Sequence, residues 1–600
     1  MKKFNKKNFI CKAMFSLAIA GLFIIPGSAE YIIRTQGHVP HIMNSGGSII
    51  YVDDDNTQGP WNGSMEYPYQ FIQDGIDHAI AGDTIYVFNG TYKENVVVSA
   101  SLEIIGHDKN NTLITGDGFG TVVKIIAENV TIRGFTITGC GKNPNNAGVM
   151  IHTRNNIIIN NTIQKNNYYG LYVIEANNTI FHNNIIQNTY QVFDVIAGST
   201  WDGGYPTGGN YWSDYIGSDE TEDGIGEDPY PTGNGSADEY PLINPYGSVF
   251  NEDTGEIFLA IQAAIDDSDT QNGHVIQVKK GEYSEHVTVN KSLLLKGEDA
   301  KNTFIDGRDI GDVVTICGNN VLLEGFFIQY SGTEEYNAGI MVSGKNNSVM
   351  SNIIYQNFHG IILKHSAEDT IISYNQIMKN NWNGITLEAG CKGACIFENT
   401  ISSNLYAGIG ISCASYNSIY HNTFITNPYQ AYDDATNIWD DGYPSGGNYW
   451  DDYTGSDADG DGIGDTPYEI PNGMNMDHYP LMAPYTNEDT IPPQITIISP
   501  RNGLYLAGLR LLSRMFQQRT LIVGAITIDV DASDAQSGID KVLFFIDDTY
   551  DPVFVDTQAP YSWKWSRRGS PLQHKFTIIV IAYDKVGNPN YDMIVVKRYL

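Results

Sequence analysis

Basic residues are scarce in this chain. Only 35 Lys and Arg stand against 69 Asp and Glu among 600 residues, and the net charge at pH 7 is −34. A surface of this sign repels phosphate backbones and anionic lipid headgroups. The composition therefore argues against nucleic acid and membrane surfaces as partners and favours cations, neutral glycans or basic proteins.

Cysteine is also rare, with six residues in the whole chain. So sparse a set cannot be the disulfide framework of a small secreted domain. Cys391 and Cys395, with Cys413 about one repeat later, could form one disulfide in an oxidising compartment. The alternative is that these residues are small buried hydrophobic side chains stacked in a core.

Long apolar runs are absent beyond the first thirty residues. Lysines at positions 2, 3, 6 and 7 precede an apolar stretch over 9–26, and the small residues Gly27, Ser28 and Ala29 follow it. This order is typical of a secretory signal peptide cleaved after Ala29, although a retained N-terminal anchor is the alternative. We therefore expect an exported protein, secreted or on the cell surface, without a further transmembrane anchor.

Short asparagine-rich repeats fill most of the chain. Asn156–Ile163 recurs about 22 residues later as Asn178–Ile185, and the pattern continues in the second half. Alternating strands broken by Asn and Gly at this period are typical of the coils of a parallel β-helix. We expect Ile, Val and Leu to stack inside, while Asn adopts left-handed backbone angles at the corners and forms side-chain ladders.

A larger repeat, of roughly 200 to 240 residues, contains these coils. Each copy opens with an amphipathic segment that we expect to be a helix covering the exposed end of the core. The apolar positions of these helices are Phe71, Ile72, Ile76 and Ile80 in the first copy and Phe258, Ile261 and Ile265 in the second. Each copy ends in a similar block, Trp201–Leu242 or Trp439–Leu481.

The composition changes after Tyr485. A proline-bearing linker is followed by widely spaced strand signals, which predict a β-sandwich. The expected fold is all-β, with two tandem right-handed parallel β-helices followed by an immunoglobulin-like sandwich. The expected segments are a signal peptide at 1–29, β-helix modules with their closing loops at 49–247 and 248–486, and the sandwich at 494–600.

Three features together resemble the NosD-like right-handed parallel β-helix repeat proteins, whose wider relatives have the pectin-lyase-like fold. They are the opening Gly90–Asn95, the Asn-rich coils, and the tails Gly209–Tyr215 and Gly447–Tyr453. The resemblance covers about 49–485 and is informative for architecture rather than activity. The last hundred residues look like the immunoglobulin-like modules of secreted microbial, especially archaeal, surface proteins.

The second closing block carries the densest chemistry. Asp457, Asp459, Asp461 and Asp465 occupy positions 1, 3, 5 and 9 of a calcium-type loop, and Ile463 offers its carbonyl at position 7. Carboxylates at this spacing suit a hard cation, although the twelfth position lacks the usual glutamate. The pattern predicts a Ca²⁺ site, and the alternative is a solvated acidic turn.

The first closing block repeats this series with fewer carboxylates. We expect weaker Ca²⁺ binding there, or only the loop shape. The corresponding residues are Asp219, Thr221, Asp223, Ile225 and Glu227.

Aromatic residues in both blocks have two interpretations. They could stack against a sugar, or they could pack a loop that closes the open end of the coil stack. The residues in question are Trp201, Tyr211, Trp212, Trp439, Tyr449 and Trp450.

Copper is a further possibility, because NosD-like proteins are often labelled copper-binding. Met474, Met476 and His478, with Met482 nearby, are soft ligands that could hold Cu(I). The equivalent segment of the first block has neither Met nor His. A site built into the repeated module is expected in both copies, so the sequence favours copper less than calcium.

The sequence therefore predicts an exported scaffold that binds carbohydrate or envelope components along its β-helix faces, with Ca²⁺ stabilising the closing loops. One rival is a polysaccharide lyase, hydrolase or epimerase, although no acid and histidine set resembling the polygalacturonases or alginate epimerases is present and the catalytic residues are unknown. A second rival is a NosD-like copper-binding or metalloenzyme-maturation protein.

Overall fold

The computed structural model describes most of the chain after its first 46 residues. The described residues are 47–485, 493–512, 520–534, 539–547, 552–566, 575–584 and 589–599. The predicted signal peptide lies outside them. The chain forms two compact units, Met1–Tyr485 and Thr486–Leu600. Within the described residues no helix is long and apolar enough to cross a membrane.

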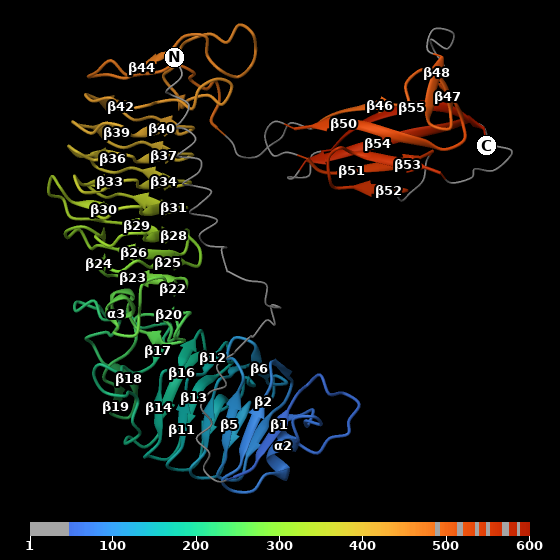
Figure 1. The fold of residues 1–600 in the computed structure, drawn as a ribbon. Helices are drawn as coiled ribbons and strands as arrows, with labels where there is room; N and C mark the ends of the chain where they lie inside the picture. The colour runs from blue at the N-terminus through green and yellow to red at the C-terminus, as the bar shows by residue number, and fades with distance from the viewer. Residues whose placement is uncertain are drawn as a thin grey trace. The chain divides into compact units, whose positions relative to one another are not determined.

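The first module is a parallel β-helix with three sheets (Figure 1). One sheet contains β1 (Ile49–Val52), β2 (Thr84–Val87), β5 (Glu103–Gly106), β8 (Thr131–Arg133), β11 (Ile157–Ile159) and β14 (Thr179–Phe181). Another contains β4 (Val96–Val98), β7 (Val123–Ile125), β10 (Ala147–Ile151), β13 (Tyr169–Val173) and β16 (Tyr190–Asp194). The third contains β3 (Gly90–Tyr92), β6 (Thr112–Thr115), β9 (Thr136–Thr138), β12 (Thr162–Gln164), β15 (Asn184–Ile186) and β17 (Tyr211–Trp212), and a hairpin of β18 (Tyr230–Gly233) and β19 (Ser236–Asp238) follows.

The second module repeats this plan with more coils. Its first sheet contains β21 (Ile257–Phe258), β20 (Val249–Asn251), β22 (Val275–Val278), β25 (Leu294–Gly297), β28 (Leu322–Glu324), β31 (Ser348–Met350), β34 (Ile371–Ser373), β37 (Cys395–Phe397) and β40 (Ser418–Tyr420). Its second contains β23 (Gly281–Tyr283), β26 (Thr303–Asp306), β29 (Phe327–Gln329), β32 (Ile353–Tyr355), β35 (Gln376–Met378), β38 (Thr400–Ser402), β41 (Thr423–Ile425) and β43 (Tyr449–Trp450). Its third contains β24 (Val287–Val289), β27 (Val314–Ile316), β30 (Ala338–Val342), β33 (His359–Leu363), β36 (Asn383–Leu387), β39 (Ala407–Ile411) and β42 (Tyr429–Asp433), and the hairpin of β44 (Tyr468–Glu469) and β45 (Met476–Asp477) follows.

In-register stacking builds the core of each module. Ile158 of β11 pairs with Ile132 of the coil before it and Ile180 of the coil after it, and all three side chains are almost completely buried. Because the side-chain period of a strand is two, this register keeps every inward residue inward along the stack. The predicted stacking of aliphatic residues is therefore confirmed.

At the corners of the coils, one residue forms the side-chain ladder and the residue before it adopts the left-handed backbone angle. Buried ladder asparagines bond along the stack, as Asn161 Nδ2 does to Asn183 Oδ1 at 3.1 Å. The left-handed angle belongs to the residue before the ladder Asn, which is itself Asn at Asn155, Asn160 and Asn177 but is Lys165 or His182 at other corners. The predictions that Asn forms ladders and that Asn adopts left-handed angles at corners are both confirmed, on neighbouring residues.

A short helix covers the opening end of each module, as predicted: α2 (Ile72–His78) and α3 (Ile261–Asp266). A carboxylate accepts the first helical N–H groups in both copies. Glu285 Oε1 and Oε2 accept the N–H groups of Ile261 and Gln262, both at 2.9 Å, and Glu94 does the same for α2 at 2.8 and 2.9 Å. The Gly-x-Tyr-x-Glu segment therefore holds the cap in place.

The predicted apolar face of the first helix is only partly correct. Ile72 and Ile76 are buried, but Phe71 is 46% exposed and Ile80 72% exposed. The helix is shorter than the apolar spacing suggests, so these two residues lie beyond its ends.

Three described cysteines bear on the predicted disulfide. Cys391 and Cys413 are free, and Cys391 is buried. A bond between either of them and Cys395 is therefore not formed. Burial raises the pKa of the Cys391 thiol to about 12, which leaves it unreactive at neutral pH.

The second unit is a β-sandwich of two sheets, as predicted. One contains β46 (Gln494–Ser499), β50 (Ile526–Ser533) and β53 (Ser562–Trp565). The other contains β48 (Leu509–Leu512), β47 (Gly503–Leu506), β49 (Thr520–Val523), β55 (Pro589–Tyr599), β54 (Lys575–Asp584), β51 (Ile539–Ile546) and β52 (Phe554–Asp556). Its core includes the buried Ile528, Phe544 and Ile578.

Candidate functional site

The four tryptophans of the closing blocks are packing residues. Trp201, Trp212, Trp439 and Trp450 are each 1% exposed. In the second block Trp450 stacks on Tyr468 with ring centroids 4.3 Å apart, and the indole of Trp212 stacks on Tyr230 in the same way at 4.2 Å. A buried indole offers no face to a sugar, so the ligand-stacking interpretation of these four residues is wrong. Tyr211 and Tyr449 of the same set are half-buried.

One asparagine ladder in each module ends on a buried aspartate of the closing block. Asp477 Oδ2 accepts the Asn448 N–H at 2.7 Å and the Trp450 indole N–H at 2.9 Å, and Asp238 makes the equivalent contacts in the first block. Burial raises the pKa of both carboxyls, from 3.8 to about 7. These hydrogen bonds satisfy the polar groups of the last coil, which identifies the block as the end of the stack.

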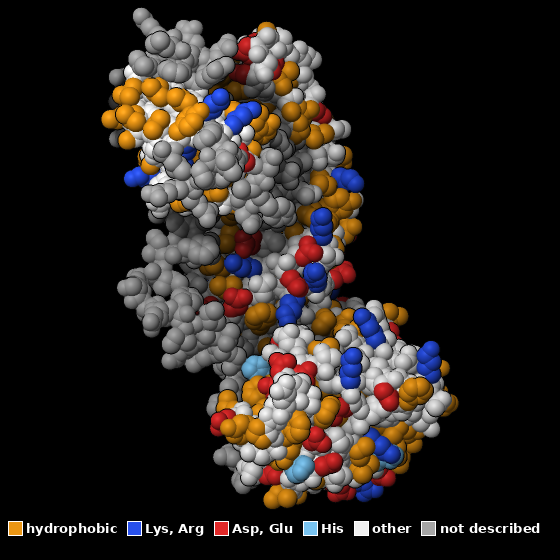
Figure 2. Space-filling model, turned by 90° about the vertical axis from the view of Figure 1, so that its right-hand side faces the viewer, with side chains coloured by type: hydrophobic (Ala, Val, Ile, Leu, Met, Phe, Trp, Pro, Cys, Tyr) orange, Lys and Arg blue, Asp and Glu red, His pale blue; other side chains and the backbone are white. Residues whose placement is uncertain are grey.

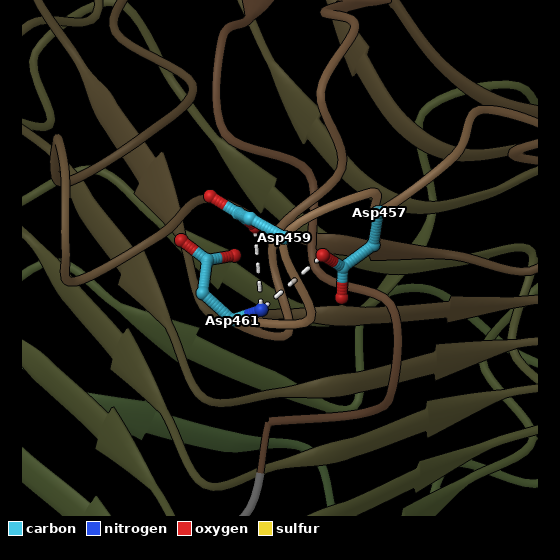
Figure 3. Close-up of side chains that lie close together, drawn as sticks. All are labelled: Asp457, Asp459 and Asp461. Atoms are coloured by element: carbon cyan, nitrogen blue, oxygen red, sulfur yellow. Dashed lines mark hydrogen bonds between the residues drawn. The ribbon is translucent and has the colours of Figure 1, made fainter.

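The predicted Ca²⁺ residues of the second block converge in part. Oxygen atoms of Asp457, Asp459 and Asp461 lie within 4.8 Å of one another on an exposed loop (Figure 3). Asp457 also orders the loop, because Oδ1 accepts the Gly460 N–H at 2.7 Å. Repulsion by Asp461 raises the pKa of Asp459, as expected for carboxylates held close together.

Asp465 is turned differently from these three aspartates. Its Oδ2 accepts the N–H of Ala458 at 2.9 Å and the hydroxyl of Ser456 at 3.1 Å. The carboxylate therefore braces the base of the loop. The carbonyl of Ile463 was the fifth predicted ligand. Ile463 has a buried side chain, and its backbone forms an isolated antiparallel β-bridge with Leu481.

The first loop is held by protein groups. Glu222 Oε1 lies 2.7 Å from His286 Nδ1 of the second module, and the Asp219 carbonyl accepts a hydrogen bond from Arg308. Glu227 accepts the Glu220 N–H at 2.8 Å. Among the described residues, Asp219, Thr221, Asp223, Ile225 and Glu227 do not form an acidic group comparable with the aspartates of the second loop.

Copper does not fit the residues of the closing block. Met474 is 93% exposed, and His478 Nδ1 lies 3.1 Å from Asp440 Oδ2. The backbone N–H of His478 also donates to Asp440, just as the backbone N–H of Glu239 donates to Asp202 in the first block. This position therefore holds the backbone of the closing block in place in both copies. In the part of the chain that the structure describes, the Asp457, Asp459 and Asp461 group is the one acidic, His or Cys cluster able to share an ion, and its hard oxygens do not suit copper.

Several outward acids of the coils are paired with cations. Lys296 and Glu324 lie 3.2 Å apart, and Lys364 and Glu388 form a comparable pair at 2.6 Å. Figure 2 shows Lys and Arg side chains interspersed with Asp and Glu on the face in view. These two pairs join neighbouring coils, so Glu324 and Glu388 stabilise the stack.

Aromatic side chains form a platform on the outer face of one sheet in each module, which the sequence did not indicate. The first platform lies on β13 and β16 and comprises Tyr168, Tyr169, Tyr172, Tyr190 and Phe193. The second lies on β36, β39 and β42 and comprises Trp382, Tyr406, Tyr429 and Tyr432. Both sit on the last coils before a closing block. In the second platform Trp382, Tyr406 and Tyr429 recur once per coil, and this spacing was a signal that could have revealed it.

The platforms are open to solvent. Tyr190 and Tyr429 are each 52% exposed, and Trp382 is 41% exposed. Trp382 and Tyr406 stack with centroids 4.4 Å apart. Next to the second platform, the Thr386 hydroxyl lies 2.9 Å from His359 Nδ1. The same hydroxyl accepts a hydrogen bond from the Asn383 amide at 3.0 Å. The exposed rings can stack against the C–H groups of a sugar.

Two family models match the chain. One, described as periplasmic copper-binding protein (NosD), matches residues 77–217 and 261–455, which is more than half of the chain. The other, described as bacterial Ig domain, matches residues 493–578 in the sandwich.

Similar proteins include a cell surface glycoprotein of Methanothermus fervidus, 37% identical over 107 residues, or 18% of this chain and 15% of that protein. Among solved structures, pectate lyase Pel9A matches with TM-score 0.20 and 10% identity, covering 67% of this chain and 74% of the lyase. The A-module of the mannuronan C-5 epimerase AlgE4 of Azotobacter vinelandii matches with TM-score 0.18 and 12% identity, covering 64% of this chain and 97% of the module. Neither structural likeness bears on activity.

Proposed function

The chain belongs to the NosD family of periplasmic copper-binding proteins, and on that premise we propose that it is an exported surface protein whose β-helix faces bind carbohydrate. The segment shared with a cell surface glycoprotein supports the location. A stack of similar coils provides a long face without a deep pocket, which suits an extended polymer.

The duplicated aromatic platforms carry this proposal. The exposed Tyr190 of the first and Tyr429 of the second occupy equivalent places on β16 and β42, and the preceding coils supply Tyr168 and Tyr406. Exposed aromatic clusters lower the solubility of a protein, so their presence favours a binding site for a ligand. The acidic surface adds a preference for neutral over anionic glycans.

Retention on immobilised polysaccharides tests the proposal. The full chain should be retarded by at least one neutral polysaccharide, and replacing Tyr190, Trp382 and Tyr429 together by Ala, which disrupts both platforms, should abolish most of the retardation. Phe119→Ala is the matched control, since Phe119 is 76% exposed but lies outside both platforms. Equal retardation of all variants would refute the platforms. Release of sugar products would instead establish the rival enzymatic function.

We further propose that Ca²⁺ stabilises the second closing loop. The support is a comparison of the two loops: the first is fastened by His286 and Arg308, whereas the second carries three clustered aspartates. A divalent cation would offset their repulsion and fasten the second loop in place of protein cations. Copper is not proposed, because the donors of this loop are hard oxygens.

A further inference from the structure

A cavity of about 360 Å³ lies where the first closing block meets the opening of the second module. Its walls include Tyr205, Thr207 and Asp223 from the first block and Tyr246 just after that block, with Phe258 and Leu259 from the second module. This volume lies near the lower end of the range of small-molecule sites, which are mostly apolar with a few placed polar groups.

The cavity offers a buried acceptor beside an aromatic ring. Asp223 Oδ1 accepts the Ile225 N–H at 3.0 Å, and the buried Oδ2 accepts no backbone N–H. The Tyr205 phenol lies beside this carboxylate, whose hydrogen bond and charge raise the pKa of the phenol, and Tyr205 is 64% exposed. A carboxylate oxygen with so few donors favours a ligand that donates a hydrogen bond to it over a purely apolar one.

The back of the cavity is aromatic. His182 and Tyr246 stack with centroids 3.9 Å apart, and the imidazole bonds the Thr207 carbonyl at 2.7 Å. Burial lowers the pKa of His182, so this ring brings no charge at neutral pH. The Asp223 carboxylate in the wall disfavours anionic ligands.

We propose that this cavity binds a neutral sugar ring, with Tyr205 as the stacking face and Asp223 Oδ2 as the acceptor of a sugar hydroxyl. The proposal shares its ligand class with the function proposed above but uses other residues, so either can fail alone.

The second closing block supplies a natural half-site. Tyr443 is 63% exposed and stands beside Asp461, whose charge raises the pKa of its phenol. Tyr485 stacks on His421 at 3.9 Å, as Tyr246 does on His182. Within the described residues no counterpart of Phe258 and Leu259 closes this half-site into a cavity, so it serves as a matched control.

Saturation-transfer NMR and calorimetric titration of the full chain test the site. The probes are glucose, galactose, mannose, N-acetylglucosamine and their β-linked disaccharides, with galacturonate, methylamine and Ca²⁺ for comparison. At least one neutral sugar should bind saturably. Tyr205→Ala and Asp223→Asn should each weaken that binding at least about tenfold, the effect of losing 1.4 kcal/mol. Tyr443→Ala should leave it unchanged.

The outcomes are distinguishable. Asp223→Asn keeps the acceptor for the Ile225 N–H, so an unchanged melting temperature shows that lost binding is not lost folding. The inference is overturned if no neutral sugar binds, if methylamine or Ca²⁺ binds there instead, or if Tyr443→Ala weakens binding as much as Tyr205→Ala. If sugar binding depends only on Trp382 and Tyr429, the junction site fails while the platform function stands.

Discussion

At the scale of single residues, the buried Asp477 should make the second closing block sensitive to pH. Its pKa rises from 3.8 to about 7 on burial, so the folded state retains a proton that the unfolded chain loses. Stability from this group is full below pH 4 and is lost as pH rises to 7. Relative to the wild type, Asp477→Asn should gain up to about 4 kcal/mol over this interval.

Denaturant titrations followed by tryptophan fluorescence at pH 4, 5, 6 and 7 measure this difference. Glu469→Gln is the control, since Glu469 is an exposed residue of the neighbouring β44. A gap between Asp477→Asn and the wild type that stays constant with pH would contradict the prediction.

Glu285 is the second residue with a sharp consequence. Its carboxylate accepts two N–H groups at the start of α3 from a buried position. Glu285→Ala would leave these donors buried without partners and should cost about 1–3 kcal/mol of unfolding free energy. Glu285→Gln keeps one carbonyl acceptor and should cost less, while Glu282→Ala, on the exposed side of β23, should cost almost nothing. Equal losses for all three would refute the cap.

The sequence predicted the structure best at positions whose residue type fits only one role, such as packing in the core. Inward Ile158 and the helix residues Ile72 and Ile261 follow from periodicity alone. The role of Trp450 could not be assigned in that way, because a tryptophan beside tyrosines gives the same sequence pattern whether it packs in a core or binds a ligand. In the folded chain its indole N–H bonds Asp477, a residue 27 positions away. The junction cavity was equally invisible, since it needs two modules to close.

At the scale of elements, the two closing loops should respond differently to calcium. The second loop brings three aspartates together, whereas the first is tied to His286. Ligand binding to the folded state raises stability by about 2.7 kcal/mol at a hundred times Kd. Calcium should therefore raise the melting temperature, and chelation should reverse it.

Asp461→Asn should remove most of this calcium response, and Asp223→Asn, at the equivalent place in the first loop, should preserve it. Differential scanning fluorimetry with calcium or chelator measures both variants. If calcium still raises the melting temperature of Asp461→Asn, the ion binds elsewhere. If calcium does not change the melting temperature of the wild type, the second closing loop is not a calcium site.

At the scale of the whole β-helical unit, the two modules meet through side chains rather than through a shared sheet. In the described residues no sheet contains strands of both modules. Glu222 instead bonds both the His286 ring, at 2.7 Å, and the His286 N–H, at 3.0 Å. Because solenoid coils contact mainly their neighbours, loss of this contact should loosen the junction without disturbing either core.

Hydrogen exchange on Glu222→Ala tests how the modules are coupled. Exchange should quicken in the first loop and around His286, while β10 and β33, inside the two stacks, should exchange as in the wild type. Glu220→Ala is the control, because Glu220 is exposed on the same loop. If the cores of both modules also exchange faster, the contact stabilises the unit globally, and the modules are one cooperative structure rather than two that unfold separately.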